Sequence, residues 1–210
     1  MTNIIKNKYE LKKEEKKQRL LDAAYKLFIT KGFRETTIQN IVDQAGVAKG
    51  TFYLYFQDRY EIQEHVIASQ AYQLFQHAID SLMKHRPDTF EERVILVVDH
   101  IIDELIENHD LLQLIRKNLS SGLFDPKLVK LLESQNSEFI KVFEEDCKTS
   151  NISISNPQLM LFMIIELAGS SCYNCILYEQ PMNIIDYKPH LYRAIKAMLH
   201  MEEVEISKKS

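Results

Sequence analysis

The amino-acid sequence predicts an all-α protein. In one segment after another, apolar residues recur at every third or fourth position, which is the spacing of one buried face of an α-helix. Several segments begin with Asp or Asn followed directly by Pro, or with Asp followed three residues later by Glu, and both patterns are typical of helix starts. The alternation that marks a β-strand occurs only briefly, at Ile152 and Ile154. These observations predict nine helices and no sheet.

The first predicted helix covers about residues 14 to 30. Its buried face consists of Leu20, Ala24, Leu27 and Phe28. Gly32 is expected to stop it. Residues 1 to about 12 are rich in lysine and are expected to form a poorly ordered basic arm. This arm is either a solvated tail and helix start or an arm that enters the minor groove, and in both cases its charge attracts DNA.

The second and third predicted helices form the most informative stretch of the chain. The apolar face of the second helix consists of Ile38, Ile41, Val42 and Ala45. Thr36 or Thr37 can cap its start, and Gly46 can adopt the positive φ of a helix end. The apolar side of the third helix consists of Val47, Phe52 and Phe56. Two short helices joined by a glycine turn predict a helix-turn-helix over about residues 37 to 56.

The third helix exposes side chains that are suited to nucleic acid. They are Lys49, Gly50, Thr51, Tyr53 and Tyr55. This set offers a cation, a bare backbone, a small hydroxyl and two phenols, which are groups that contact base edges and phosphate oxygens. A helix that served only for packing would not need them.

Several short motifs occur together in this part of the chain. In order they are Asp22-Ala23-Ala24, Leu27-Phe28, Lys31-Gly32-Phe33, Thr36-Thr37, Ile41-Val42, Ala45-Gly46-Val47, Lys49-Gly50-Thr51-Phe52-Tyr53 and Tyr55-Phe56 followed by Arg59. By this combined spacing, about residues 15 to 65 resemble the DNA-binding domain of the TetR family of transcriptional regulators. The rest of the chain resembles the family in the number, length and order of its helices.

The resemblance implies DNA-binding roles for eight residues. We expect the base contacts to come from Gln39, Lys49, Gly50 and Thr51. We expect the phosphate contacts to come from Thr37, Tyr53, Tyr55 and Arg59. Many family members have lysine at the position of Arg59, and arginine keeps the charge that a phosphate contact needs.

The distribution of charge supports a division into two domains. The whole chain has a formal charge of -4, but residues 1 to 60 carry +5 and residues 61 to 210 carry -9. A basic end beside an acidic body suggests that one domain meets phosphate and the other does not. We therefore expect an N-terminal DNA-binding domain over residues 1–60 and a C-terminal ligand-binding and dimerisation domain over residues 61–210.

Six further helices are predicted in order. Their approximate ranges are residues 59–84, 88–107, 111–119, 125–147, 158–178 and 184–200. Asp58 with Glu61, and Asp88 with Glu91, are spaced as capping boxes at the first two of these helices. Asp125-Pro126 and Asn156-Pro157 combine a cap with proline at the first helical position. In the resemblance, the helix of residues 59–84 joins the DNA-binding domain to the body.

The helix of residues 158–178 predicts a homodimer. It is apolar nearly all round, so it must be covered on more than one side. Its small residues 168–172 also permit another helix to approach closely. The resemblance strengthens the inference that this helix and residues 184–200 form a four-helix interface with a second copy. The alternative is a central helix buried within a monomer.

Candidate ligand-binding residues are less specific. Glu166 lies within the apolar helix, where an unpaired carboxylate is costly, so we expect it to meet Arg116, Arg193, a histidine or a ligand. His100 presents the same alternatives. The aromatic residues that either line a pocket or belong to an ordinary core are Tyr72, Phe75, Phe139, Phe143, Phe162 and Tyr173.

Other classes of function find no support. The sequence has no phosphate-binding glycine loop, H-E-x-x-H motif, nucleophile elbow or Glu-x-x-His pair, so we expect no enzyme, cofactor or metal. Cys147, Cys172 and Cys175 are expected to be buried and reduced. We expect neither a membrane span nor a signal peptide, and hence a cytoplasmic protein.

These observations predict a homodimeric repressor that binds a palindromic operator. A small apolar or amphipathic effector, bound by the body, would release it from double-stranded DNA. The alternative is a helical ligand carrier or scaffold dimer whose helix-turn-helix is only architectural. Sequence-specific DNA binding separates the two.

Overall fold

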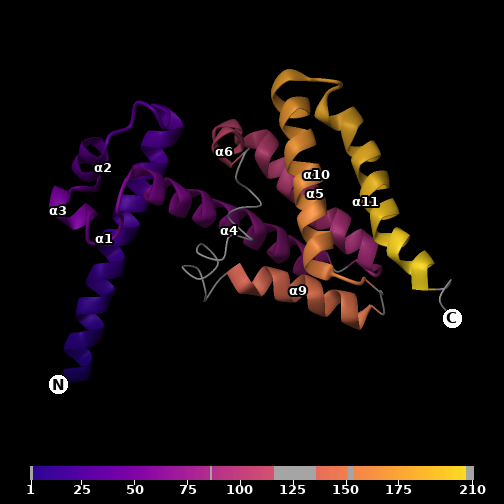
Figure 1. Ribbon diagram of the computed structural model, residues 1–210, viewed down its shortest axis with the longest axis horizontal. Coiled ribbons are helices and arrows are strands. Elements are labelled where there is room, and N and C mark those ends of the chain that lie inside the picture. The colour runs from indigo at the N-terminus through magenta and orange to yellow at the C-terminus, as the bar shows by residue number, and fades with distance from the viewer. Residues whose placement is uncertain (1, 86, 116–135, 151–153, 207–210) are drawn as a thin grey trace. The chain divides into compact units, whose positions relative to one another are not determined.

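The computed structural model describes residues 2–85, 87–115, 136–150 and 154–206, and the side chains of residues 11–85, 87–115, 140–150 and 154–200. Within these ranges the fold is all-α, as predicted, and contains nine helices (Figure 1). They are α1 (Thr2–Thr30), α2 (Ile38–Ala45), α3 (Lys49–Phe52), α4 (Arg59–His85), α5 (Phe90–Glu107), α6 (His109–Ile115), α9 (Asn136–Thr149), α10 (Pro157–Tyr178) and α11 (Ile184–Ile206). The predicted helix start at Asp125 lies outside the described residues.

The chain divides into two compact units, Met1–Ile67 and Ala68–Ser210. The division falls inside α4, so this continuous helix contributes its first residues to the N-terminal unit and the remainder to the C-terminal unit.

The N-terminal unit consists of α1, α2, α3 and the start of α4. Its core contains the apolar faces predicted for the first three helices, and its buried members include Leu20, Ala24, Leu27, Phe28, Ile41, Val42, Ala45, Phe52 and Phe56. The expectation of a poorly ordered arm is wrong, because α1 begins at Thr2. Residues 2–30 contain no Gly or Pro and many Lys, Glu and Leu residues, whose helical propensity outweighs the mutual repulsion of the lysines.

The caps of α2 and α10 are at predicted residues, whereas the cap of α5 is shifted by one residue. At α5 the capping box is Thr89 and Glu92 rather than Asp88 and Glu91, because the same four-residue pattern recurs one position later. The Thr89 hydroxyl accepts from the Glu92 N–H at 3.3 Å, and the Glu92 carboxylate accepts from the Thr89 N–H at 3.3 Å. The cap predicted for α10 is confirmed, since Asn156 accepts from the Leu159 N–H at 3.0 Å.

The C-terminal unit is built around α10. This helix packs against α5, α9 and α11 (Figure 1). The core of this unit includes Val98, Ile102, Ile164 and Leu191. Among the described helices, α10 alone is long and apolar enough to cross a membrane by length and composition. It packs against α5, α9 and α11 and leaves one stripe exposed.

The three cysteines are free and buried, as predicted. Burial raises the pKa of the Cys147 thiol to about 11 and that of the Cys172 thiol to about 12, so both are protonated at neutral pH. Burial also raises the pKa of Cys175. Thiols in this state are poor nucleophiles and poor metal ligands, so the Cys172-x-x-Cys175 spacing serves the packing of α10.

Candidate nucleic-acid interface and internal cavity

The turn between α2 and α3 is held by interactions on both sides. Thr37 caps α2 by accepting from the Asn40 N–H at 3.1 Å, and the Asn40 side chain accepts from the Thr37 N–H at 3.0 Å. Gly46 ends the helix with φ +64°, a conformation that glycine adopts without strain. Arg19, on α1, donates to the carbonyls of Ala45 at 2.5 Å and Gly46 at 3.1 Å. Sequence reasoning missed Arg19, because nothing local marks its partners 26 and 27 residues away.

The side chains predicted to contact DNA surround the short helix α3. Lys49, Gly50 and Tyr53 are exposed, Thr51 is half-buried, and the adjacent Phe52 is fully buried and anchors the helix. A Cβ atom added at Gly50 would meet no atom within 4 Å. The fold itself therefore does not require glycine at this position, which leaves room for the close approach of another molecule.

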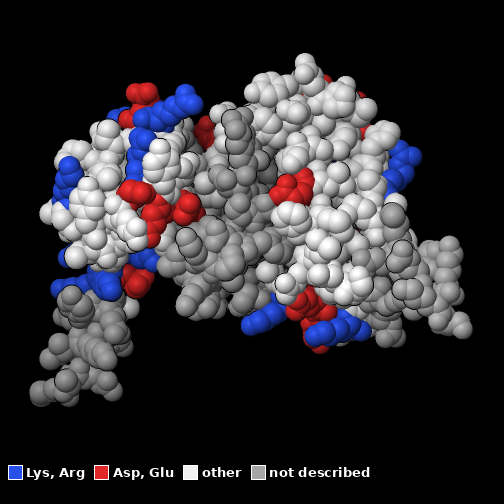
Figure 2. Space-filling view, viewed as in Figure 1, with Lys and Arg blue, Asp and Glu red and all other residues white. Residues whose placement is uncertain are grey.

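Two other predicted DNA contacts already have partners within the unit. Gln39 is exposed and donates to the Asp43 carboxylate at 2.8 Å. The Tyr55 hydroxyl donates to the Lys13 carbonyl on α1 at 3.0 Å. Leu54, which sequence reasoning did not single out, is 75% exposed at the end of the same segment. Figure 2 shows lysine and arginine side chains on this unit, interspersed with acidic ones.

Arg59 faces inward rather than standing free for a phosphate. Its Nη1 lies 3.0 Å from the Phe33 carbonyl oxygen, 3.0 Å from that of Arg34 and 2.7 Å from that of Thr36. The guanidinium carbon also lies 4.3 Å from the centroid of the Phe33 ring. Arg59 thereby ties the first turn of α4 to the turn that leads into the cap of α2. This planar, stacked arrangement gives a reason for arginine in place of lysine.

Arg59→Ala is expected to lower the free energy of unfolding by about 2 kcal/mol, because the turn loses a charged donor. Thermal unfolding of this variant and of Arg59→Lys measures the effect. The salt dependence of DNA binding is expected to keep its slope, whereas removal of a phosphate contact would reduce the slope by about one. A reduced slope with an unchanged unfolding midpoint would contradict the role of Arg59 in the turn.

The C-terminal unit contains an apolar cavity of about 80 Å³. Residues of α4, α5, α6, α9 and α10 line it, among them Phe75, Val98, Ile115, Phe143 and Ile164. Arg93 and Asp146 are the charged members of the described lining.

The structure brings together only part of the predicted ligand site. Phe75 and Phe143 line the cavity. Five other candidates do not belong to its lining, namely Tyr72, His100, Phe162, Glu166 and Tyr173. The side chain of Phe139, like that of Arg116, lies outside the described residues.

The expectation that Glu166 is buried is wrong, because its side chain is exposed. It lies on an exposed stripe of α10 that consists of Leu159, Phe162, Met163, Glu166, Ser170 and Asn174. The sequence of α10 is apolar on all sides, so its pattern did not reveal which face the body leaves uncovered. The small residues Ala168, Gly169 and Cys172 instead line the cavity. Among the small residues 168–172, Ser170 lies on the exposed stripe.

His100 is half-buried, and the acidic residues on either side of it have another partner. Lys188, on α11, donates to Asp99 at 2.6 Å and also to Asp103. The Tyr192 hydroxyl donates to Asp99 as well. These contacts tie α5 to α11. Hydrogen bonds to both carboxylates raise the pKa of Lys188 despite its burial, which acts in the opposite direction.

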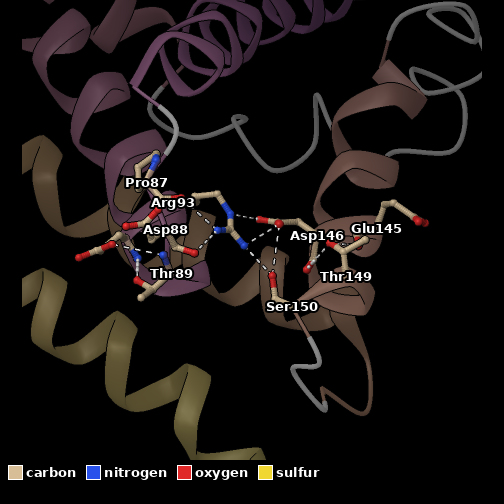
Figure 3. Close-up of polar contacts among 9 residues, drawn as sticks. Pro87, Asp88, Thr89, Arg93, Glu145, Asp146, Thr149 and Ser150 are labelled. Carbon is tan, nitrogen blue, oxygen red and sulfur yellow. Dashed lines mark hydrogen bonds and ion pairs between the residues drawn. The ribbon is translucent and has the colours of Figure 1, made fainter.

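Arg93 forms the main polar cluster at the cavity (Figure 3). Its Nε and Nη2 donate to the two oxygens of Asp146, on α9, at 2.9 and 2.8 Å. Nη1 donates to the carbonyls of Pro87 at 3.1 Å and Asp88 at 2.8 Å, and Nη2 also reaches the Ser150 hydroxyl at 2.5 Å. The hydrogen bond to Asp146 raises the pKa of Arg93. Sequence reasoning missed this pair, whose members are 53 residues apart.

Comparison with known proteins agrees with this architecture. Residues 20–66 match the model of bacterial regulatory proteins of the tetR family. An HTH-type transcriptional regulator of Bacillus subtilis, YerO, is 47% identical over 45 residues, which are 21% of this chain and only 16% of YerO. A second one, YvdT, is 26% identical over 190 residues, which are 88% of this chain and 95% of YvdT. These relatives are named as regulators and not as enzymes.

The fold is also shared with solved structures. The transcriptional regulator FadR from Bacillus subtilis, solved with stearoyl-CoA, superposes with a TM-score of 0.58 at 18% identity, and the match covers 85% of this chain and 96% of FadR. The helix-turn-helix, the all-α body and the matched family model agree with one another. The chain therefore resembles the TetR family of transcriptional regulators, whose family model matches residues 20–66.

Proposed function

We propose that the protein is a repressor that binds a palindromic operator as a homodimer and leaves it when a small apolar or amphipathic effector enters the cavity. The observation that carries this proposal is the continuity of α4. Its first residue, Arg59, holds the turn before α2, and further along the same helix Phe75, Ile79 and Leu82 line the cavity. One continuous helix therefore contributes residues both to the unit that holds the helix-turn-helix and to the lining of the cavity. The cytoplasm, where DNA is accessible, is the proposed location.

The size of the cavity supports a switch. Drug-sized ligands occupy pockets of about 300–1,000 Å³, and even a benzene site measures about 150 Å³. The 80 Å³ observed here is smaller than both. A ligand must therefore widen the cavity by moving helices that line it, and α4 is one of them. FadR, which shares the fold, was solved with stearoyl-CoA, an amphipathic molecule with a long apolar chain.

The exposed stripe of α10 supports the homodimer. Leu159, Phe162 and Met163 are 50%, 38% and 37% exposed, and Figure 2 shows that the surface over α10 is mostly uncharged. Apolar side chains grouped in this way favour contact with a second copy, together with α11. In a dimer with a two-fold axis, the two helix-turn-helix units require a palindromic DNA site. Its half-sites lie about one helical turn, or roughly 34 Å, apart.

The proposed switch predicts reciprocal coupling between effector and operator. A ligand that widens the cavity moves α4 and, with it, the helix-turn-helix, so it lowers the affinity for the operator. Operator DNA must then lower the affinity for the ligand by the same factor. The expected coupling is about 1–3 kcal/mol.

The measurement starts with a thermal-shift screen of apolar and amphipathic compounds. An operator obtained by selection from random DNA is then titrated in the presence of each hit. Leu82→Trp is a control, because the larger side chain fills the cavity from α4. It should weaken the binding of the hits and reduce their effect on operator affinity. Hits that bind in the cavity but never change operator affinity would leave a constitutive DNA binder.

A further inference from the structure

Arg93 is held in place independently of its carboxylate partner. The carbonyls of Pro87 and Asp88 accept from Nη1, on one side of the guanidinium. The opposite edge, formed by Nε and Nη2, binds Asp146 in the bidentate geometry that arginine uses for carboxylates (Figure 3). If Asp146 moved away, the two carbonyls would keep Arg93 where it is.

Asp146 has weaker anchors of its own. Apart from Arg93, its described side-chain partner is the Ser150 hydroxyl, 3.4 Å away on the same helix end. The pair is therefore asymmetric. An incoming carboxylate would meet a two-donor edge that the carbonyls of Pro87 and Asp88 hold in place, after displacing one side chain that has fewer anchors. An incoming cation would have to displace a guanidinium that three other oxygen atoms also hold.

The pair also occupies the position that an amphiphile's head would need. Arg93 and Asp146 line the apolar cavity on one side, and on the other they border a polar hollow with Thr89, Thr149 and Ser150. Their side chains are 19% and 25% exposed, so a head bound to Arg93 would be largely shielded from water while Asp146 could turn outward. A chain attached to that head would extend among apolar side chains such as Val97, Phe143 and Leu161.

We propose that the effector is an amphiphile with a single carboxylate head, whose oxygens replace those of Asp146 on Arg93 while its apolar chain fills the cavity. This inference rests on the proposed function of the cavity as the effector site. The exchange releases α9 from α5, which gives the cavity a way to widen. Asp88 and Glu91 at the border of the hollow repel a head with several negative charges more strongly than a head with one, which favours the single carboxylate.

The test is isothermal titration calorimetry on the full-length protein with three probes of equal chain length: octanoate, 1-octanol and octylammonium. Octanoate is expected to bind about tenfold more tightly than 1-octanol, because it alone can take both donors of Arg93. Asp146→Asn, which weakens the internal competitor, is expected to raise octanoate affinity about tenfold and to leave 1-octanol unchanged. Arg93→Gln is expected to remove the preference for octanoate.

Asp99→Asn provides a matched control, since it makes the same change at another ion pair of α5 and should leave octanoate affinity unaltered. Equal affinities for octanoate and 1-octanol, tighter binding of octylammonium, or no gain in Asp146→Asn would each overturn the proposal, even if Arg93→Gln does not fold. These titrations contain no DNA. If octanoate binds but leaves operator affinity unchanged, the proposed repressor switch is rejected and the carboxylate site is not. If 1-octanol changes operator affinity as much as octanoate does, the proposed preference for a carboxylate head is rejected and the switch is not.

Discussion

Gly50→Leu is expected to abolish specific operator binding while leaving the fold intact. Gly50 is exposed within α3, and a side chain there would meet no atom of the protein within 4 Å. A helix that approaches base edges closely has no room for a branched side chain, so the variant should bind operator no better than random DNA. That difference corresponds to about 4–10 kcal/mol.

The stability of the Gly50 variants separates this effect from misfolding. Leucine is favoured over glycine within a helix by up to about 1 kcal/mol, so the unfolding midpoint should stay the same or rise. Gly50→Ala is expected to lose less affinity than Gly50→Leu, because the loss should grow with the volume added. Gln44→Leu, at an exposed position of α2, controls for added apolar surface. Operator affinity is measured by fluorescence anisotropy. A Gly50→Leu protein that still distinguishes operator from random DNA would place the base-reading surface elsewhere.

Ser170→Arg is expected to split the proposed homodimer. Ser170 is the small residue of the exposed stripe on α10, between the carboxylate of Glu166 and the amide of Asn174. A long side chain placed there would hold the two apolar faces apart by its bulk, and this effect remains even if Glu166, one turn away, pairs with the new charge. Sedimentation velocity should then show a species with the 24.7 kDa mass of one chain.

The loss of the dimer should also weaken operator binding, because two linked heads bind a palindrome about 100- to 10,000-fold more tightly than one. Met163→Glu, on the same stripe, is expected to act in the same way. Gln113→Arg makes the matched change on the exposed side of α6 and should leave the dimer intact. Gly169 is unsuited to this test, since it lines the cavity and a large side chain would fill the ligand site. If Ser170→Arg and Met163→Glu both sediment as dimers, the interface lies on another face.

The sequence was sufficient to predict those features of the helix-turn-helix that depend on residues close together in the chain. The capping threonine of α2, the left-handed Gly46 and the buried face of Ile41, Val42 and Ala45 all follow from spacings of one to four residues. Helix caps depend on equally short distances, but where two overlapping patterns compete, as at Asp88 and Thr89, sequence alone does not choose between them. Helix existence was therefore easier to predict than helix boundaries.

Contacts between residues far apart in the sequence were not predicted. Arg19, Arg59 and Arg93 each bind backbone carbonyls or a carboxylate supplied by another part of the chain, and nothing in the sequence marks these partners. Predicting such a bond requires the relative position and rotation of two helices, which are set by the packing of their apolar faces. The prediction that Arg59 is available to a phosphate lacked this information.

The amino-acid sequence by itself determined the all-α architecture, the helix-turn-helix and the resemblance to the TetR family, because helical periodicity, caps and turn residues act over a few residues. Only the tertiary structure decided which face of α10 is covered. A helix that is apolar on all sides carries no periodic signal, so its rotation is set by how its side chains fit those of α5, α9 and α11. That fit places Glu166 outside, Gly169 at the cavity and the Arg93–Asp146 pair at its polar border.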